Sequence, residues 1–92
     1  MYTAKDIMES LKDLERLERK ADECDAIYEQ NPESEQAESD FDMAFRAQWN
    51  HTEKCVEMIR EFSGNSIDAR TARRLLKADY RHDLMMALLV GA

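Results

Sequence analysis

The chain has 92 residues, which is enough for one compact core and too few for a second. Hydrophobic residues make up 43% of it and charged residues 36%, so it is too apolar for a disordered chain and too charged for a membrane protein. With only two glycines, one proline and few β-branched clusters, the composition disfavours strands and favours helices.

The first predicted helix covers residues 4–29. Thr3 can cap its free amides while Asp6, three residues later, reaches back to form a capping box. Apolar side chains then recur every 3.5 residues on average, a spacing that predicts left-handed supercoiling against neighbouring helices. This stripe consists of Ile7, Leu11, Leu14, Leu17, Ala21, Cys24 and Tyr28.

The second predicted helix covers residues 32–62. Asn31 and Pro32 separate it from the first, because proline disfavours the helical conformation of the preceding residue but suits the first turn of a helix. Either Asn31 or Ser34 can cap it. We expect its single tryptophan, Trp49, to lie in the core, together with the other residues of the apolar face: Ala37, Phe41, Ala44, Phe45, Thr52, Cys55, Val56, Ile59 and Phe62.

The third predicted helix covers residues 66–90. Gly64 suits the left-handed position that ends the second helix, and Ser66 can cap the third. The fold class that follows is all-α: a three-helix bundle built on a long antiparallel hairpin, forming a single domain over residues 1–92.

The end of the third helix predicts self-association. Residues 84–90 are apolar around the whole circumference, and a small bundle cannot easily bury every side of a terminal helix. We therefore expect a homo-oligomer, with the alternative that this helix is wedged between the first two. The residues expected at the contact between copies are Tyr80, Leu84, Met85, Met86, Leu88 and Leu89.

Charge is divided unevenly along the chain. Residues 1–62 hold 8 Lys and Arg against 17 Asp and Glu, a net charge of −9, whereas residues 63–92 hold 5 against 3, a net charge of +2. No basic residue lies between Lys20 and Arg46, so an acidic surface is expected around the tip of the hairpin. It is either a solvated region or a binding surface for a basic protein. Its members are Asp22, Glu23, Asp25, Glu29, Glu33, Glu35, Glu38, Asp40 and Asp42.

The third helix carries a basic stripe of Arg70, Arg73, Arg74, Lys77 and Arg81. These side chains can pair with the acidic surface of the first two helices or with a partner. Direct binding to nucleic acid is not favoured, because a protein with an isoelectric point near 4.8 lacks the overall positive charge that such binding needs.

No residue pattern indicates a catalytic, cofactor or metal site. His51 and Cys55 are one helical turn apart, a spacing found in zinc sites, but two ligands do not make a site and a hydrogen-bonded core histidine is expected instead. Cys24 and Cys55 should lie roughly 20 Å apart in the hairpin, as free thiols of a reducing compartment. Without a signal peptide or a stretch of about 20 apolar residues, a cytoplasmic location is expected.

Two functions are compatible with these features. The first is a non-enzymatic helical module that acts through protein–protein contact as a small regulatory or structural oligomer. The alternative is a small acidic inhibitor of the kind that phages and mobile elements encode, an anti-CRISPR-like or other nucleic-acid mimic that blocks a basic groove of a nucleic-acid-processing complex.

Overall fold

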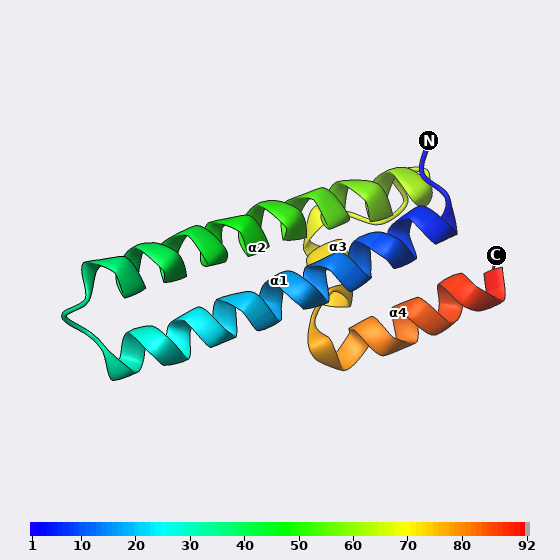
Figure 1. Cartoon of the computed structure of the whole chain (residues 1–92). Helices are drawn as coiled ribbons and strands as arrows, with labels where there is room; N and C mark the ends of the chain where they lie inside the picture. The colour runs from blue at the N-terminus through cyan, green and yellow to red at the C-terminus, as the bar shows by residue number, and fades with distance from the viewer. Residues whose placement is uncertain (92) are drawn as a thin grey trace.

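A computed structural model describes residues 1–91, and over this range the protein is built from four helices (Figure 1). The long helices α1 (Ala4–Gln30) and α2 (Glu35–Phe62) form an antiparallel hairpin. The shorter helices α3 (Ala69–Leu75) and α4 (Ala78–Gly91) pack near its open end, where both termini also lie. The molecule is elongated, 48 × 20 × 19 Å. The all-helical class is confirmed, and none of the four helices is long and apolar enough to cross a bilayer.

Side-chain caps fix the ends of the hairpin helices. The predicted capping box is present: Thr3 Oγ1 accepts a hydrogen bond from the Asp6 amide at 3.1 Å, and the Asp6 carboxylate accepts one from the Thr3 amide at 3.0 Å. At the tip, Ser34 caps α2, which begins three residues later than predicted. Asn31 closes α1 instead, because its amide and its side-chain nitrogen both donate to the Ile27 carbonyl.

Left-handed residues end α2 as expected. Gly64 has a φ of +65° and Asn65 a φ of +64°, and the Asn65 amide donates to the Arg60 carbonyl at 2.8 Å. Glycine and asparagine are the residues that adopt this conformation at least cost. The cap of the next helix is Asp68, not Ser66 as predicted, and its Oδ1 atom accepts a hydrogen bond from the Thr71 amide at 2.7 Å.

The prediction of one continuous third helix is wrong, since the chain turns at Leu76 and Lys77 between α3 and α4. Packing explains the break. Ala72 and Leu76 are buried where α3 lies on α2, whereas α4 packs on α1, and one straight helix cannot follow both directions. Arg81 Nε donates to the Leu76 carbonyl at 3.0 Å, which satisfies a carbonyl at the end of α3. No glycine or proline marks this position.

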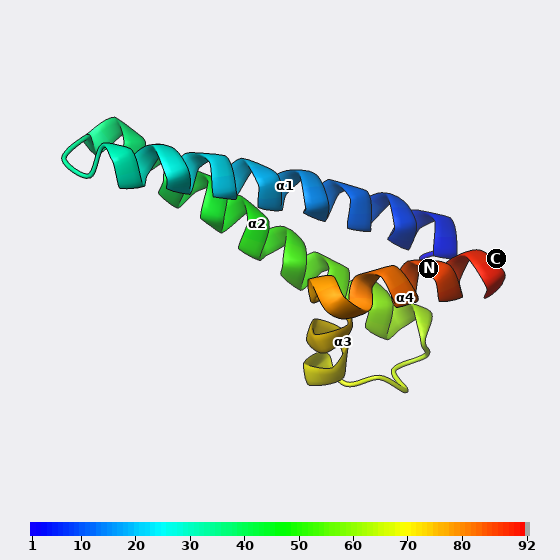
Figure 2. The same ribbon diagram turned by 90° about the horizontal axis from the view of Figure 1, so that it is seen from below.

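The hydrophobic core has two parts of unequal size. The larger part, the proximal core, joins all four helices and consists of Ala4, Ile7, Leu11, Leu14, Cys55, Val56, Met58, Ile59, Ala72, Leu76 and Leu88. The smaller part lies toward the tip and consists of Ala21, Cys24 and Ala44, with Phe41 packed against them. We call residues 20–49 the distal hairpin. Here only α1 and α2 contact each other, so the molecule is two helices thick (Figure 2).

Candidate interaction surfaces

The six residues expected at a contact between copies point in two directions. Leu88 is buried in the proximal core, and Leu84 and Met85 are half-buried against it. These three side chains hold α4 against its own chain. Tyr80, Met86 and Leu89 are about half exposed, and Val90 beside them is 85% exposed. The alternative of a last helix wedged between the first two is not what the fold shows, because α4 packs on α1 and α3.

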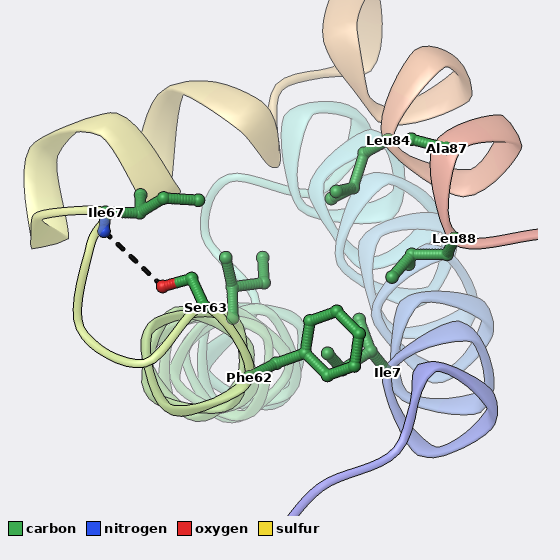
Figure 3. A pocket seen from close by; sticks show the side chains of 8 residues that line it. Ile7, Phe62, Ser63, Ile67, Leu84, Ala87 and Leu88 are labelled. Carbon is green, nitrogen blue, oxygen red and sulfur yellow. Dashed lines mark hydrogen bonds between the residues drawn. The ribbon is translucent and has the colours of Figure 1, made fainter. Parts of the chain in front are cut away.

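An apolar pocket of about 260 Å³ lies beneath the edge of α4 (Figure 3). It separates α4 from the end of α2 and from the loop that leads to α3. Side chains of all three segments and of α1 line it, among them Ile7, Ile59, Phe62, Ile67, Leu84 and Leu88. The lining offers few polar groups that would orient a small molecule, so the pocket suits an apolar side chain better than a substrate.

The distal hairpin exposes four large apolar side chains, Ile27, Met43, Phe45 and Trp49, each at least half accessible to solvent. The expectation that Trp49 lies in the core is therefore wrong. Trp49 lies on the same side of α2 as Val56, seven residues further on, but α3 covers only Val56. The apolar residues over 41–49 occupy a wide arc of the helix surface, and a single neighbouring helix cannot cover all of it. This width was the signal in the sequence that some of these side chains would be exposed.

The nine predicted acidic residues surround the tip of the hairpin, and all are exposed except Asp25, which is half-buried. Within residues 1–91 their only ion pair joins Asp42 to Arg46, at 3.1 Å on a well-exposed surface. Three of them, Glu35, Glu38 and Asp42, line one open hollow with the stacked rings of Tyr28 and Phe41. The acidic surface is thus contiguous with aromatic side chains.

The basic stripe predicted for the third helix is divided by the break in that helix. Arg73 donates two hydrogen bonds to the Glu53 carboxylate, at 3.0 and 2.9 Å, which raises the pKa of Arg73 and lowers that of Glu53. Arg81 pairs with Glu18. Arg70, Arg74 and Lys77 are exposed and form no ion pair with any part of the described chain.

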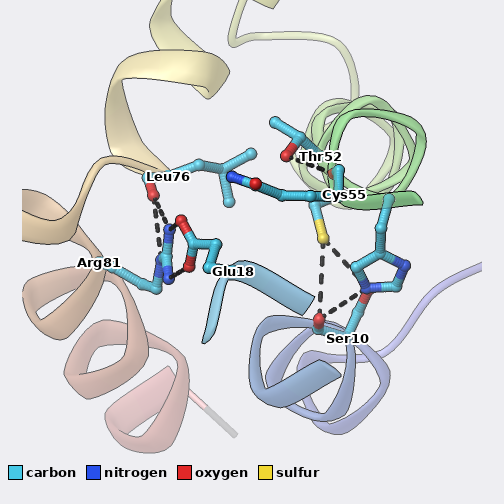
Figure 4. Close-up of polar contacts among 8 residues, drawn as sticks. Ser10, Glu18, Thr52, Cys55, Leu76 and Arg81 are labelled. Atoms are coloured by element: carbon cyan, nitrogen blue, oxygen red, sulfur yellow. Dashed lines mark hydrogen bonds and ion pairs between the residues drawn. The ribbon is translucent and has the colours of Figure 1, made fainter. Parts of the chain in front are cut away.

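His51 and Cys55 meet at one buried residue of α1, Ser10 (Figure 4). The Ser10 hydroxyl lies 3.2 Å from Cys55 Sγ and 3.2 Å from His51 Nε2, and that nitrogen donates to the Ser10 carbonyl at 2.8 Å. Burial raises the pKa of the Cys55 thiol, which keeps it protonated and a poor nucleophile. The cluster satisfies polar groups between α1 and α2.

Across residues 1–91, no three His, Cys, Asp or Glu side chains gather closely enough to hold a metal ion. Comparison of the chain with protein-family models, with curated proteins and with solved structures found no match. What remains as candidate functional surface is the outer side of α4 and the acidic, aromatic distal hairpin.

Proposed function

We propose that this protein is a non-enzymatic helical interaction module that acts by binding other proteins, first of all further copies of itself through α4. The observation that carries the proposal is the outer face of α4, where Met86, Leu89 and Val90 are exposed together. Met86 and Val90 are four residues apart and Leu89 lies between them, so the three share one side of the helix. The solvent side of a surface helix is normally polar.

The inner side of α4 supports the same proposal. Leu84 and Leu88 pack against the proximal core, so α4 is held in place while its outer apolar side stays free. The half-exposed ring of Phe62 and the apolar pocket adjoin this helix and extend the surface that a second copy can cover. Burial of apolar area in the centre of an interface is the main source of affinity in homodimers.

Light scattering at high salt tests the proposal, because salt suppresses contacts between exposed charges. The native protein should have the mass of a dimer or larger, and the double variant Met86→Gln, Val90→Gln should be a monomer. Met43→Gln is the matched control, since Met43 is an exposed methionine of the distal hairpin. A native protein that is monomeric at about 100 μM, well above typical homodimer dissociation constants, would overturn the proposal.

A second candidate function is the acidic inhibitor of a nucleic-acid-binding protein. The observation that favours it is the lack of ion pairs: of the nine acidic residues, only Asp42 has a basic partner in the described chain. Dense carboxylates of this kind can occupy a groove built for phosphates. In affinity capture from extract of the source cell, the native protein should retain a nucleic-acid-binding protein that high salt releases. Reversal of charge at Glu35, Glu38 and Asp42 should abolish that capture, and unchanged capture would contradict the idea.

A further inference from the structure

The molecule is thick at one end, where α3 packs on α2 and α4 packs on α1, and thin at the other (Figure 2). Helix α3 projects from one side of α2 near Val56 (Figure 2). Trp49 precedes Val56 by seven residues, and Phe45 precedes Trp49 by four, so both point to the same side. From α3 to the tip, this side of α2 carries no covering helix. A second molecule turned end for end could place its projecting α3 there.

The way α3 sits on α2 shows what this surface accepts. Ala72 of α3 is fully buried where Val56 is covered, and Arg73 next to it forms a two-point ion pair with Glu53 of α2. This side of α2 therefore binds a helix that offers an arginine to a carboxylate beside an apolar patch. A bidentate guanidinium–carboxylate pair is the strongest geometry available for such a contact.

The same combination recurs, uncovered, toward the tip. Glu38 lies seven residues before Phe45, and Asp42 lies seven before Trp49. Seven residues are two turns of helix, so each carboxylate is on the same side of α2 as the aromatic residue that follows it. Glu35 lies in turn seven residues before Asp42, in the same hollow. The distal side of α2 is thus an apolar patch next to three carboxylates, of which Asp42 pairs with Arg46 of the same helix at an exposed position.

The complementary charges are present in the same chain. Arg70 and Arg74 lie four residues apart on α3, and both project within about 20° of the direction opposite Ala72. Lys77 follows in the turn after α3. All three are exposed and make no ion pair within residues 1–91. The outward side of α3 therefore presents two cations to the solvent, and the turn that follows adds a third, Lys77.

We propose that two copies pair antiparallel about a two-fold axis, each placing Arg70, Arg74 and Lys77 against Glu35, Glu38 and Asp42 of the other. Along α2, the centres of the acidic and α3-bearing segments are about 24 Å apart, from a rise of 1.5 Å per residue. The axis halfway between them passes between Phe45 and Trp49. The two charged contacts form simultaneously by symmetry and supply most of the affinity, and the tryptophans of both copies lie at the centre.

This inference rests on the proposed self-association but uses a surface distinct from the outer side of α4. The two contacts respond differently to salt. The charged contact forms at about 0.02 M salt and is lost at about 0.5 M, whereas the apolar contact of α4 persists. A protein that associates at low salt and is a monomer at high salt would therefore contradict the α4 proposal alone. A dimer or larger species whose mass salt does not change would overturn the antiparallel pair alone.

Charge reversal with complementation gives the decisive test. The basic-reversed variant carries Arg70→Glu, Arg74→Glu and Lys77→Glu, and the acid-reversed variant carries Glu35→Lys, Glu38→Lys and Asp42→Lys. Each should weaken low-salt association at least about a hundredfold, because like charges then face each other. An equimolar mixture should associate again, since in a mixed pair both contacts regain opposite charges. Arg16→Glu, Arg19→Glu, Lys20→Glu is the control for net charge, on exposed positions of α1.

Association is measured by sedimentation and by the fluorescence of Trp49, the only tryptophan of the chain. The emission should shift to shorter wavelength when the native protein associates at low salt and when the two variants are mixed. Circular dichroism establishes that each variant is helical before mixing. These measurements are made in the Met86→Gln, Val90→Gln background, which removes the contact through α4. Low-salt association that survives either reversal in this background overturns the proposal, and so does a mixture of two folded variants that stays dissociated.

Discussion

Arg81 of α4 forms an ion pair with Glu18 of α1 and thereby joins the C-terminal helix to the middle of the hairpin (Figure 4). Its Nη2 atom donates to Glu18 Oε2 at 3.0 Å, and its Nε atom donates to the Leu76 carbonyl at 3.0 Å. The Arg81 side chain is only 12% exposed. One guanidinium therefore secures the turn between α3 and α4 and fixes that turn against α1.

Replacement of Arg81 by methionine should destabilise the fold by about 1–3 kcal/mol, because it leaves the Leu76 carbonyl and the half-buried Glu18 carboxylate without their donors. Urea denaturation followed by circular dichroism measures this loss. Arg16→Met is the matched control: Arg16 is largely exposed and its pair with Asp13 is long, at 4.0 Å, so almost no change is expected. Equal losses in the two variants would contradict the role given to Arg81.

Leu11 and Trp49 should differ sharply in their contribution to stability. Leu11 is 1% exposed in the proximal core, so Leu11→Ala should cost about 2–5 kcal/mol. Trp49 is half exposed, so Trp49→Ala should cost much less, within about 1 kcal/mol. Denaturant unfolding at high salt, where the charged contact between copies is suppressed, compares the two variants. A large loss for Trp49→Ala under these conditions would mean that Trp49 is packed within the single chain.

Periodicity predicted the buried stripe of α1 because α1 has neighbours along most of its length. Ile7, Leu11 and Leu14 are all nearly inaccessible, as their spacing indicated. The same reasoning failed at Trp49. The apolar pattern identifies the side chains on one face of a helix, but it does not show whether another helix packs on that face. The turn at Leu76 also lacked a local signal, because packing against α1 and α2 sets it and no glycine or proline is required.

Acid should weaken the cap of α3. The Thr71 amide hydrogen bond lowers the pKa of Asp68 below its ordinary value of 3.8. The folded pKa is thus below the unfolded one, so the stabilisation is present above about pH 4 and is lost as the pH falls through the folded pKa. Asp68→Asn keeps a capping side chain without a titrating group. Its unfolding free energy should therefore fall less than that of the native protein between pH 6 and pH 2.5, in urea titrations compared across about this range. Parallel curves would contradict the assignment.

The Cys55 thiol should resist modification in the folded protein. Burial raises its pKa above the ordinary value of 9.0, and only the thiolate reacts readily. In a Cys24→Ser background, alkylation by iodoacetamide should follow unfolding in urea, as read by mass spectrometry. Above about pH 9, the unfolded chain ionises this thiol while the folded chain does not, so the protein should lose stability as the pH rises. Rapid labelling without denaturant would show that Cys55 is accessible.

The candidate surfaces were only partly predictable. The acidic block and the basic stripe are visible in the sequence because charge needs no fold to be counted. Which arginines remain free is a matter of geometry: Arg73 reaches Glu53, whereas Arg70, three residues earlier, points elsewhere on the short helix and finds no carboxylate in the described chain. The exposed side of α4 is likewise set by packing. Because Leu88 is buried in the proximal core, Met86 and Val90 face outward.

The unequal division of the core also sets how the molecule opens. Four small buried residues, Ala21, Cys24, Ala37 and Ala44, lie in the distal hairpin, against eleven in the proximal core. Amides near the tip should therefore exchange with solvent through local opening that leaves the rest folded. Amides around Leu11 and Cys55 should exchange only on global unfolding. Any molecule that covers Trp49 adds apolar contacts where the chain has fewest, and occupancy of this surface should therefore appear as slower exchange from Ala21 to Trp49, a readout of binding that needs no knowledge of the partner.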